Sequence, residues 1–224
     1  MVRSNTLDAA AMAFDLGADD VVDPGVPVPE LAFRLRSLVR RKRAADRQRT
    51  RMQDSLRLAL VDPLTGLYNR RYAAPQLNAI AAHAADTGNA YAVMIVDLDR
   101  FKRVNDQHGH AAGDLVLVEV ARRLTANLRD GDLLARIGGE EFLIALPDST
   151  LTDAGSVAER LCQAVEERPI RLPSGQGLTV TVSIGVAVSG GGISVDAVVE
   201  EADLALLDSK VSGRNQVTFR LSAA

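Results

Sequence analysis

The sequence predicts an α/β sandwich with a mixed, mostly antiparallel β-sheet and a central β-hairpin, preceded by one long helix. The hairpin is indicated by two adjacent glycines, Gly138 and Gly139, between the strand-length apolar runs 132–137 and 142–146. Glycine takes positive φ without steric cost, as hairpin turns require. Helical and strand-like periodicities alternate around this hairpin from residue 62 onward. The long helix is indicated by an unbroken helical pattern over 29–61.

Residues 1–28 are the first of three predicted parts. They are acidic, rich in alanine and too few to close a core of their own, and we expect a helix over 9–16 and a short strand over 20–22. Residues 13–20, Pro24 and residues 30–31 resemble the C-terminal end of a response-regulator receiver domain. The resemblance implies a receiver remnant without its phospho-accepting aspartate, and Asp23 stands where receivers usually have lysine.

Residues 29–61 are the second part, a helical stalk. Pro29 suits a first helical turn and Pro63 ends the pattern, so the stalk is about 50 Å long at ~1.5 Å per residue. The seam of this helix is apolar at both ends and polar in the middle. The pattern therefore fits a solvated connector helix and a dimerising coiled coil equally well. The seam positions, in alternating steps of four and three, are Leu31, Leu35, Leu38, Lys42, Ala45, Arg49, Met52, Leu56 and Ala59.

The composition indicates a globular protein without a membrane or nucleic-acid partner. Of 224 residues 47% are hydrophobic, yet no stretch approaches the ~20 consecutive apolar residues of a membrane helix. The stalk has ten basic and two acidic residues between positions 34 and 57. It has no aromatic side chain there on which bases could stack, so we expect a solvated basic face. The single cysteine, Cys162, and the lack of a signal peptide's apolar segment favour a cytoplasmic protein.

Residues 62–224, the third part, follow the predicted order α-β-α-α-β-β-α-β-α-β. The first strand, 91–96, is continuously apolar, which is typical of a strand buried on both faces. The run 178–188 alternates apolar with small or polar residues and predicts a half-buried antiparallel strand. Helices are expected after a turn at 62–71, after Leu98, after Gly113 and Asp114, and over 154–167 and 194–209, with a closing strand over 216–219.

Acidic residues lie at the ends of two of these strands. Asp97 ends the first strand, and Glu140 and Glu141 follow the hairpin glycines, so the acids meet at one edge if the two elements are neighbours in the sheet. Carboxylate oxygens suit Mg²⁺ shared with substrate phosphates. Lys210 and Arg214, after the last helix, add positive charge against a polyphosphate. The pattern predicts a nucleoside triphosphate site, although the acidic turn alone is also explained by solvation.

Six ordered motifs make residues 62–224 resemble a GGDEF domain, the catalytic domain of diguanylate cyclases, which has a nucleotidyl-cyclase-like fold. With the stalk and the remnant, the chain is similar to PleD-type response regulators of two-component signalling. The motifs are Asp62-x-Leu64-Thr65-Gly66-Leu67-x-Asn69-Arg70-Arg71, Asp97-x-Asp99-x-Phe101-Lys102-x-x-Asn105-Asp106, Gly109-His110-x-x-Gly113-Asp114, Gly138-Gly139-Glu140-Glu141-Phe142, Ser183-x-Gly185-Val186 and Lys210-x-x-Gly213-Arg214-Asn215.

The resemblance implies an Mg²⁺-dependent cyclase, with Mn²⁺ as a possible alternative, that condenses two GTP into cyclic di-GMP and two pyrophosphates. Asp97, the Leu98 carbonyl and Glu140 would hold the metal. Glu141 would lie beside it, and Glu140 is the favoured proton acceptor, although a metal-bound carboxylate is a weak base. Each domain would hold one GTP, so a homodimer with facing half-sites would be the active species.

The same resemblance assigns the substrate and product contacts. Asn105 and Asp114 would read guanine, and the backbone amides at Phe101 and Lys102 would seat phosphates. Gly138 and Gly139 would let the nucleotide approach the backbone, while Lys210 and Arg214 would contact phosphates. The RxxD pair Arg129 and Asp132, joined by Arg160 from a neighbouring domain, would form an inhibitory site for cyclic di-GMP.

Other interpretations remain open at this stage. A non-catalytic GTP or cyclic di-GMP sensor or output adaptor is disfavoured because a binder does not need both metal acids. A polymerase palm or mononucleotide cyclase is disfavoured by the guanine pair. His108 and His110 have some zinc-site character, but Gly109-His110 matches the family's loop. Leu207 and Asp208 depart from the family pattern before Lys210, and we expect them to reduce activity.

Overall fold

The computed structural model describes residues 2–3, 11–13, 15–22, 25–190 and 192–221, without the side chains of residues 2–3, 49–58 and 221. The chain divides into two compact units, residues 1–57 and residues 58–224. The second, called the compact unit below, contains all of the site residues predicted from the sequence.

Among the residues that the structure describes, the N-terminal unit contains a short parallel strand pair, a helical segment and most of a long helix. Strand β1 (Val2–Arg3) pairs with β2 (Val21–Val22), as the short strand at 20–22 predicts. Residues 11–13 are helical and Gly17 has a φ of 89°, whereas positions 9–10 and 14 of the predicted first helix and the receiver-like positions Asp23 and Pro24 lie outside the described residues.

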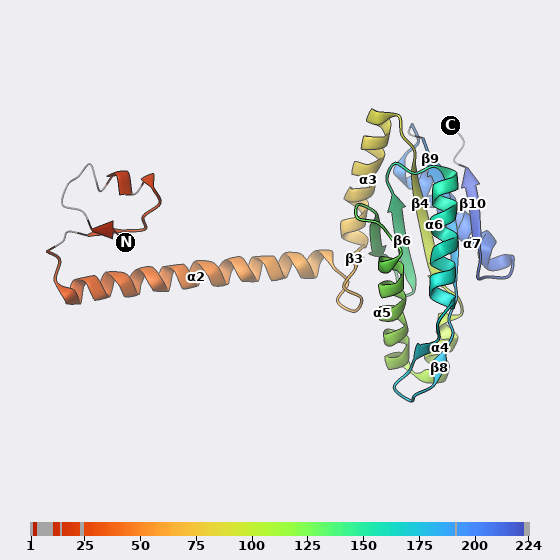
Figure 1. Cartoon of the computed structure of the whole chain (residues 1–224), viewed down its shortest axis with the longest axis horizontal. Coiled ribbons are helices and arrows are strands. Elements are labelled where there is room, and N and C mark those ends of the chain that lie inside the picture. The colour runs from red at the N-terminus through yellow and green to blue at the C-terminus, as the bar shows by residue number, and fades with distance from the viewer. Residues whose placement is uncertain (1, 4–10, 14, 23–24, 191, 222–224) are drawn as a thin grey trace. The chain divides into compact units, whose positions relative to one another are not determined.

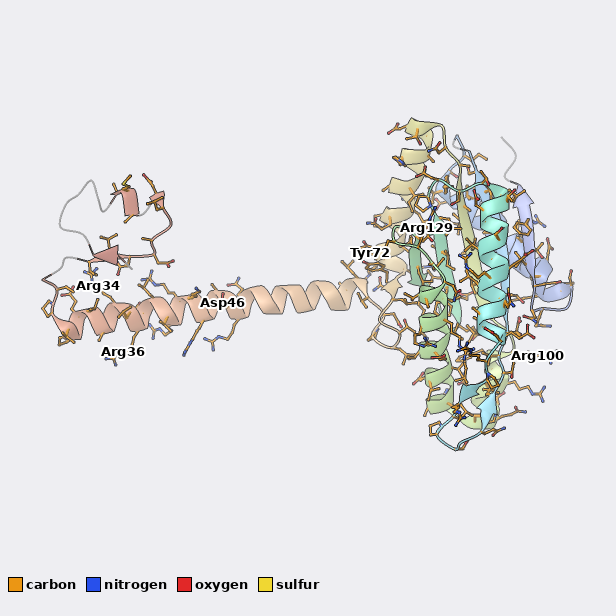
Figure 2. All side chains as sticks on the ribbon, viewed as in Figure 1. Arg34, Arg36, Asp46, Tyr72, Arg100 and Arg129 are labelled. Carbon is orange, nitrogen blue, oxygen red and sulfur yellow. The ribbon has the colours of Figure 1, made fainter. Side chains whose placement is uncertain are left out.

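Helix α2 (Val28–Leu60) runs through both units at the position predicted for the stalk. Arg34 joins its first turns to the segment before β2, with nitrogens 3.0 Å from Glu30 and 3.5 Å from Asp20 (Figure 2). Leu31 and Leu38 of the seam are half-buried and Leu35 is exposed, while the side chains of Arg49, Met52 and Leu56 lie outside the described part. Dimerisation through this helix therefore stays a prediction. Within the described residues, no helix is long and apolar enough to cross a membrane.

The compact unit is built on one six-stranded sheet with the order β10-β9-β4-β6-β5-β3. The three inner pairs are antiparallel and the two outer pairs are parallel, which confirms the mixed, mostly antiparallel sheet and the central β5–β6 hairpin. Its strands are β3 (Tyr68–Asn69), β4 (Tyr91–Leu98), β5 (Leu133–Arg136), β6 (Glu141–Leu146), β9 (Val182–Ser189) and β10 (Val217–Leu221), and its helices are α3 (Arg70–Thr87), α4 (Phe101–His108), α5 (His110–Ala126), α6 (Leu151–Glu166) and α7 (Val195–Val211).

Helices cover both faces of this sheet, as Figure 1 shows. Even-numbered residues of β4, such as Met94 and Val96, pack in one core with α4, α5 and α6, whereas odd-numbered ones, such as Tyr91 and Ile95, pack in a second core with α3 and α7. The continuous apolar run at 91–96 is therefore a fully buried central strand, as predicted.

Three sequence-based expectations need correction. Helix α5 starts at His110, so Gly113 and Asp114 lie in its first turns and do not precede it. The predicted strand over 178–188 is β9 alone, while Leu178 belongs to a separate small pair, β8 (Gly177–Leu178) with β7 (Ile170–Arg171). Strand β9 is buried on both faces because its small residues pack against α7 instead of facing solvent. The short edge strand β3 was not predicted.

Gly185 gives the sharpest test of this packing. A Cβ atom built at Gly185 would overlap the backbone of α7 at Ala202 and Leu206, and backbone cannot move aside as a flexible side chain can. We expect Gly185→Ala to lower the free energy of unfolding by roughly 1–3 kcal/mol, measured by urea denaturation. Gly190→Ala is the matched control, because its Cβ would meet no atom within 4 Å, and an equal loss in both variants would contradict the packing account.

Candidate active site

The site begins with the register between the two central strands. Asp97 on β4 lies directly opposite Glu141 on β6 and opposite Ser183 on β9. As an odd-numbered residue of β4, Asp97 belongs to the face covered by α7, and the Lys210 ammonium near the end of that helix lies 2.9 Å from its carboxylate. Asp97 is 6% exposed and the Lys210 side chain 31% exposed, so the carboxylate is shielded from water and the ammonium only in part.

The hairpin turn brings the second acid to the same place. The Leu98 amide donates a hydrogen bond of 3.3 Å to the Glu140 carbonyl, which fixes the turn beside the end of β4. Neither Gly138 nor Gly139 has a positive φ, so the reason given for them above is wrong. A Cβ at Gly138 would meet the Glu141 carboxylate, which is the end of a flexible side chain and can move aside, and a Cβ at Gly139 would meet no atom within 4 Å, so these contacts require glycine at neither position.

The electrostatics of this group favour a bound cation. Burial raises the pKa of Asp97, and Glu141 and Asp99 raise it further against the opposing effect of Lys210. Burial and then repulsion from Asp97 raise the pKa of Glu140. Ionisation of either carboxylate therefore costs free energy. A positive charge bound nearby would lower that cost.

The donor set fits a magnesium ion that shares its coordination sphere with a ligand. Within the described part of the chain, no three His, Cys, Asp or Glu side chains are arranged to hold a metal by themselves. Asp97, Glu140 and the Leu98 carbonyl together offer two carboxylates and one carbonyl oxygen. Hard oxygen donors of this kind suit Mg²⁺ or Mn²⁺, and Mg²⁺ usually keeps several waters and substrate phosphates as its remaining ligands.

The proposed guanine-reading residues lie between α4 and α5. Gly113 is buried against α4, and a Cβ at this position would overlap the Asn105 side chain and contact the Phe101 ring. The next residue, Asp114, is exposed, and its carboxylate has no hydrogen bond or ion pair to any residue that the structure describes. Phe101 and Lys102 open α4, where the first backbone amides of a helix have no intrahelical acceptor.

Lys210 and Arg214 have different surroundings in the structure. Lys210 contacts Asp97, whereas Arg214 lines a neighbouring cavity with Asp99 and Arg100. Asp99 positions this region: its carboxylate accepts hydrogen bonds from Thr181 and Ser183 at 2.7 Å and from the Asn215 amide at 3.0 Å. Its place two residues after Asp97 is the only sequence signal for that role.

Arg136 is a further site residue that the sequence analysis missed. Its guanidinium donates to the Gly139 carbonyl at 2.6 and 3.2 Å and to Asp62 at 2.9 Å, so it links the hairpin to the turn that opens the compact unit. Burial acts to raise the pKa of Asp62, but hydrogen bonds from Thr65 and Arg136 outweigh it and leave the pKa lowered. The sequence feature that could have indicated this role is the position of an arginine directly before the hairpin turn.

The predicted product-site residues surround a second cavity, of about 340 Å³. Arg129 lies 3.0 Å from Asp132 and also donates to the Pro147 carbonyl at 2.6 Å (Figure 2). Arg160 lines the same cavity from α6, donating to the Asn127 carbonyl at 2.9 Å. All three residues line one cavity of the chain, and the contribution of Arg160 to the site of a neighbouring domain stays a prediction.

Comparison with known proteins agrees with this geometry. The family model described as "Diguanylate cyclase, GGDEF domain" matches residues 59–216. The response regulator PleD of Caulobacter vibrioides is 41% identical over 97% of this chain, which spans 48% of PleD. The diguanylate cyclase DgcP of Pseudomonas aeruginosa is 36% identical over 84% of this chain and 28% of DgcP. The chain thus spans about half or less of the length of these relatives.

A solved structure resembles the chain over most of its length. It holds the coiled coil and GGDEF domain of DgcB from Caulobacter crescentus in complex with c-di-GMP. The TM-score is 0.77 and the identity 31%, covering 82% of this chain and 97% of that one. The fold class and the family expected from the six motifs are both confirmed. The receiver-like part is not tested by these matches.

The contacts of Arg136 predict that the hairpin loosens when they are removed. In Arg136→Gln, the two hydrogen bonds to Gly139 and the ion pair with Asp62 are lost. We expect the hairpin amides of Ile137 and Gly138, which bond to Glu141, to exchange with deuterium roughly tenfold faster. Exposed Arg168→Gln is the control, and unchanged exchange at both amides would remove Arg136 from the hairpin's support.

Proposed function

Because the chain belongs to the GGDEF family, we propose that it is a diguanylate cyclase that condenses two GTP into cyclic di-GMP and releases two pyrophosphates. The observation that carries this proposal is the convergence of Asp97, Glu140 and Lys210 at the end of β4. Two acids of raised pKa facing a lysine form a site for a metal and a phosphate. A turn with a purely structural role would not need two acids and a lysine grouped together.

The residues of the chain would divide the chemistry as follows. Asp97, Glu140 and the Leu98 carbonyl would hold Mg²⁺, or Mn²⁺ in its place. When bound, the metal would neutralise the triphosphate and acidify the attacking 3′-hydroxyl. Lys210 would supply a point charge to a phosphate oxygen. Glu140 is the favoured acceptor for the hydroxyl proton, although its carboxylate is a weak base while it holds the metal.

The choice of guanine would rest on Asn105 and Asp114. The carboxylate of Asp114 is free to accept from both the N1–H and the exocyclic amine of guanine, a pair of donors that adenine does not have. Asn105, in contact with Gly113, would add a donor and an acceptor beside it. Phosphates would lie against the first amides of α4 at Phe101 and Lys102, beside the glycine turn.

One chain holds only half of the reaction. Since each compact unit binds one GTP in this proposal, two chains related by a two-fold axis would have to bring their sites together, and the stalk is the element that could hold them. We also place the protein in the cytoplasm, where its substrate is found. A non-catalytic nucleotide sensor is the competing function, and activity distinguishes it.

The cyclase proposal is tested by product formation from GTP and Mg²⁺, followed by nucleotide chromatography. We expect cyclic di-GMP from the wild type and at least a hundredfold lower rate from Glu140→Gln, since the substitution removes a ligand charge while keeping the side chain's shape. Glu159→Gln, which removes an exposed acid from α6, should behave as the wild type. A wild type that binds GTP without turnover would establish the sensor instead.

We further propose that cyclic di-GMP inhibits through the cavity of Arg129, Asp132 and Arg160. Cyclic di-GMP carries two phosphates and two guanines, and an arginine can fork onto a phosphate or a guanine edge while Asp132 accepts from a guanine amine. The Arg129 side chain is 60% exposed, so a ligand can reach it, whereas the Asp132 side chain is 2% exposed and accepts from Arg129, so the ligand would have to displace Arg129 to reach Asp132. The cavity involves none of the residues placed around Asp97, so inhibition would not compete with GTP.

Progress curves test this feedback. We expect the initial rate of Arg129→Ala to stay within about twofold of the wild type. The slowing that accompanies product accumulation should be lost, because the guanidinium that would bind the product is removed. Arg168→Ala should slow as the wild type does. Curves that remain equally bent in Arg129→Ala, or inhibition that excess GTP reverses, would refute the mechanism.

A further inference from the structure

A glycine stands where helices α4 and α5 come closest. Gly113 lies inside α5 and is buried against α4. Glycine inside a helix is locally unfavourable, because it loses more backbone freedom on folding than alanine does. Gly113 does not have a positive φ, so no left-handed turn requires it. The reason for glycine at this position must therefore lie in the atoms around it.

The atoms closest to Gly113 belong to the side chain of Asn105. A Cβ built at Gly113 would overlap the Asn105 side-chain oxygen, and it would lie 3.0 Å from the Asn105 Cγ and 3.2 Å from the Phe101 Cζ. Phe101 is 6% exposed, so its ring has little room to move. Asn105 is half-buried, and its amide is not closed off from solvent. Asn105 is therefore the side chain that would give way to a larger residue at position 113.

The backbones of the two helices are held in place on either side of this contact. The Gly109 amide donates to the Asn105 carbonyl at 2.8 Å, and the Gly113 amide donates to the Gly109 carbonyl at 3.2 Å. Beyond this corner, Val116 and Leu117 fix α5 in the buried core. An added Cβ would therefore displace the Asn105 side chain while the helices keep their positions.

Packing holds the Asn105 amide in its orientation. Its side chain makes no hydrogen bond to any residue that the structure describes, although its carbonyl ends α4. The two amide donors and the carbonyl acceptor are therefore available to a ligand. Asp114 follows Gly113 directly and is exposed, so the close approach at Gly113 also sets where Asn105 lies relative to Asp114.

We propose that Gly113 is a positioning residue for base recognition and contributes to the preference for guanine over adenine. The inference rests on the proposed function, in which Asn105 and Asp114 contact guanine. Gly113 does not touch the base in this account. By having no side chain, it leaves the space in which the Asn105 amide lies. Alanine at this position would turn Asn105 away, and a site built to hydrogen-bond its ligand loses affinity when a partner is misplaced.

Calorimetric titration of the full chain with non-hydrolysable GTP and ATP analogues, in the presence of Mg²⁺, tests this role. We expect Gly113→Ala to bind the GTP analogue at least about fivefold more weakly than the wild type. Its affinity for the ATP analogue should stay the same, because Asn105 and Asp114 do not match adenine. Gly155→Ala is the matched control inside α6, where the Cβ would make an ordinary contact of 3.4 Å with the Phe219 ring, and both affinities should equal those of the wild type.

A double-mutant cycle separates positioning from other effects of the substitution. Asn105→Ala should also weaken binding of the GTP analogue, and Asn105→Ala/Gly113→Ala should bind it no more weakly than Asn105→Ala alone, since the side chain that Gly113 positions is then absent. The proposal is overturned if the two losses add in the double variant. It is also overturned if Gly113→Ala binds the GTP analogue within about twofold of the wild type while Asn105→Ala does not.

Two further outcomes are distinct from these. A Gly113→Ala protein without a cooperative thermal melt contradicts the proposal, because the Asn105 side chain would then have failed to give way. Wild-type affinity of Asn105→Ala for the GTP analogue would show that Asn105 does not contact guanine. The base assignment of the proposed function would then fail, and the role of Gly113 with it.

Discussion

The register between β4 and β6 is the constraint on which the rest of the site depends. It sets Asp97 opposite Glu141 and, through the alternation of side chains along β4, turns Asp97 toward α7 and Lys210. A slip of one residue would send every side chain of a strand to the opposite face. A slip of β4 would force both cores to repack, because its even and odd residues fill two different cores. Burial of apolar side chains thus fixes the position of a charged group.

This arrangement has an electrostatic cost that the surroundings offset. Asp97 and Glu140 both have raised pKa values, so the folded unit is stabilised less when they are ionised than when they are protonated. Lys210 counters part of this repulsion from α7, and Arg136 holds the turn that carries Glu140. Functional sites are where such unfavourable charge repulsion, stabilised by neighbouring residues, is expected.

The sequence carried most of the fold because periodicity reports burial directly. The apolar run at 91–96, the glycine hairpin and the helical spacings predicted the central strand, its neighbour and the order of elements, and the six motifs predicted the family. Contacts between side chains far apart in the chain could not be predicted from the sequence. Arg214 lies in the left-handed turn after α7 and lines a cavity with Asp99, whereas Lys210 contacts Asp97, and the spacing of four residues did not separate the two. The receiver remnant and the dimer remain predictions.

Binding of Mn²⁺, followed by electron paramagnetic resonance in the presence of a non-hydrolysable GTP analogue, tests most directly whether the β4–β6 register builds a metal site. The account predicts that the affinity of Asp97→Asn for Mn²⁺ is at least about tenfold lower than that of the wild type, and that the affinity of Glu159→Gln equals that of the wild type. Equal Mn²⁺ affinity in Asp97→Asn and the wild type would contradict it, because the end of β4 would then not be where the metal is held.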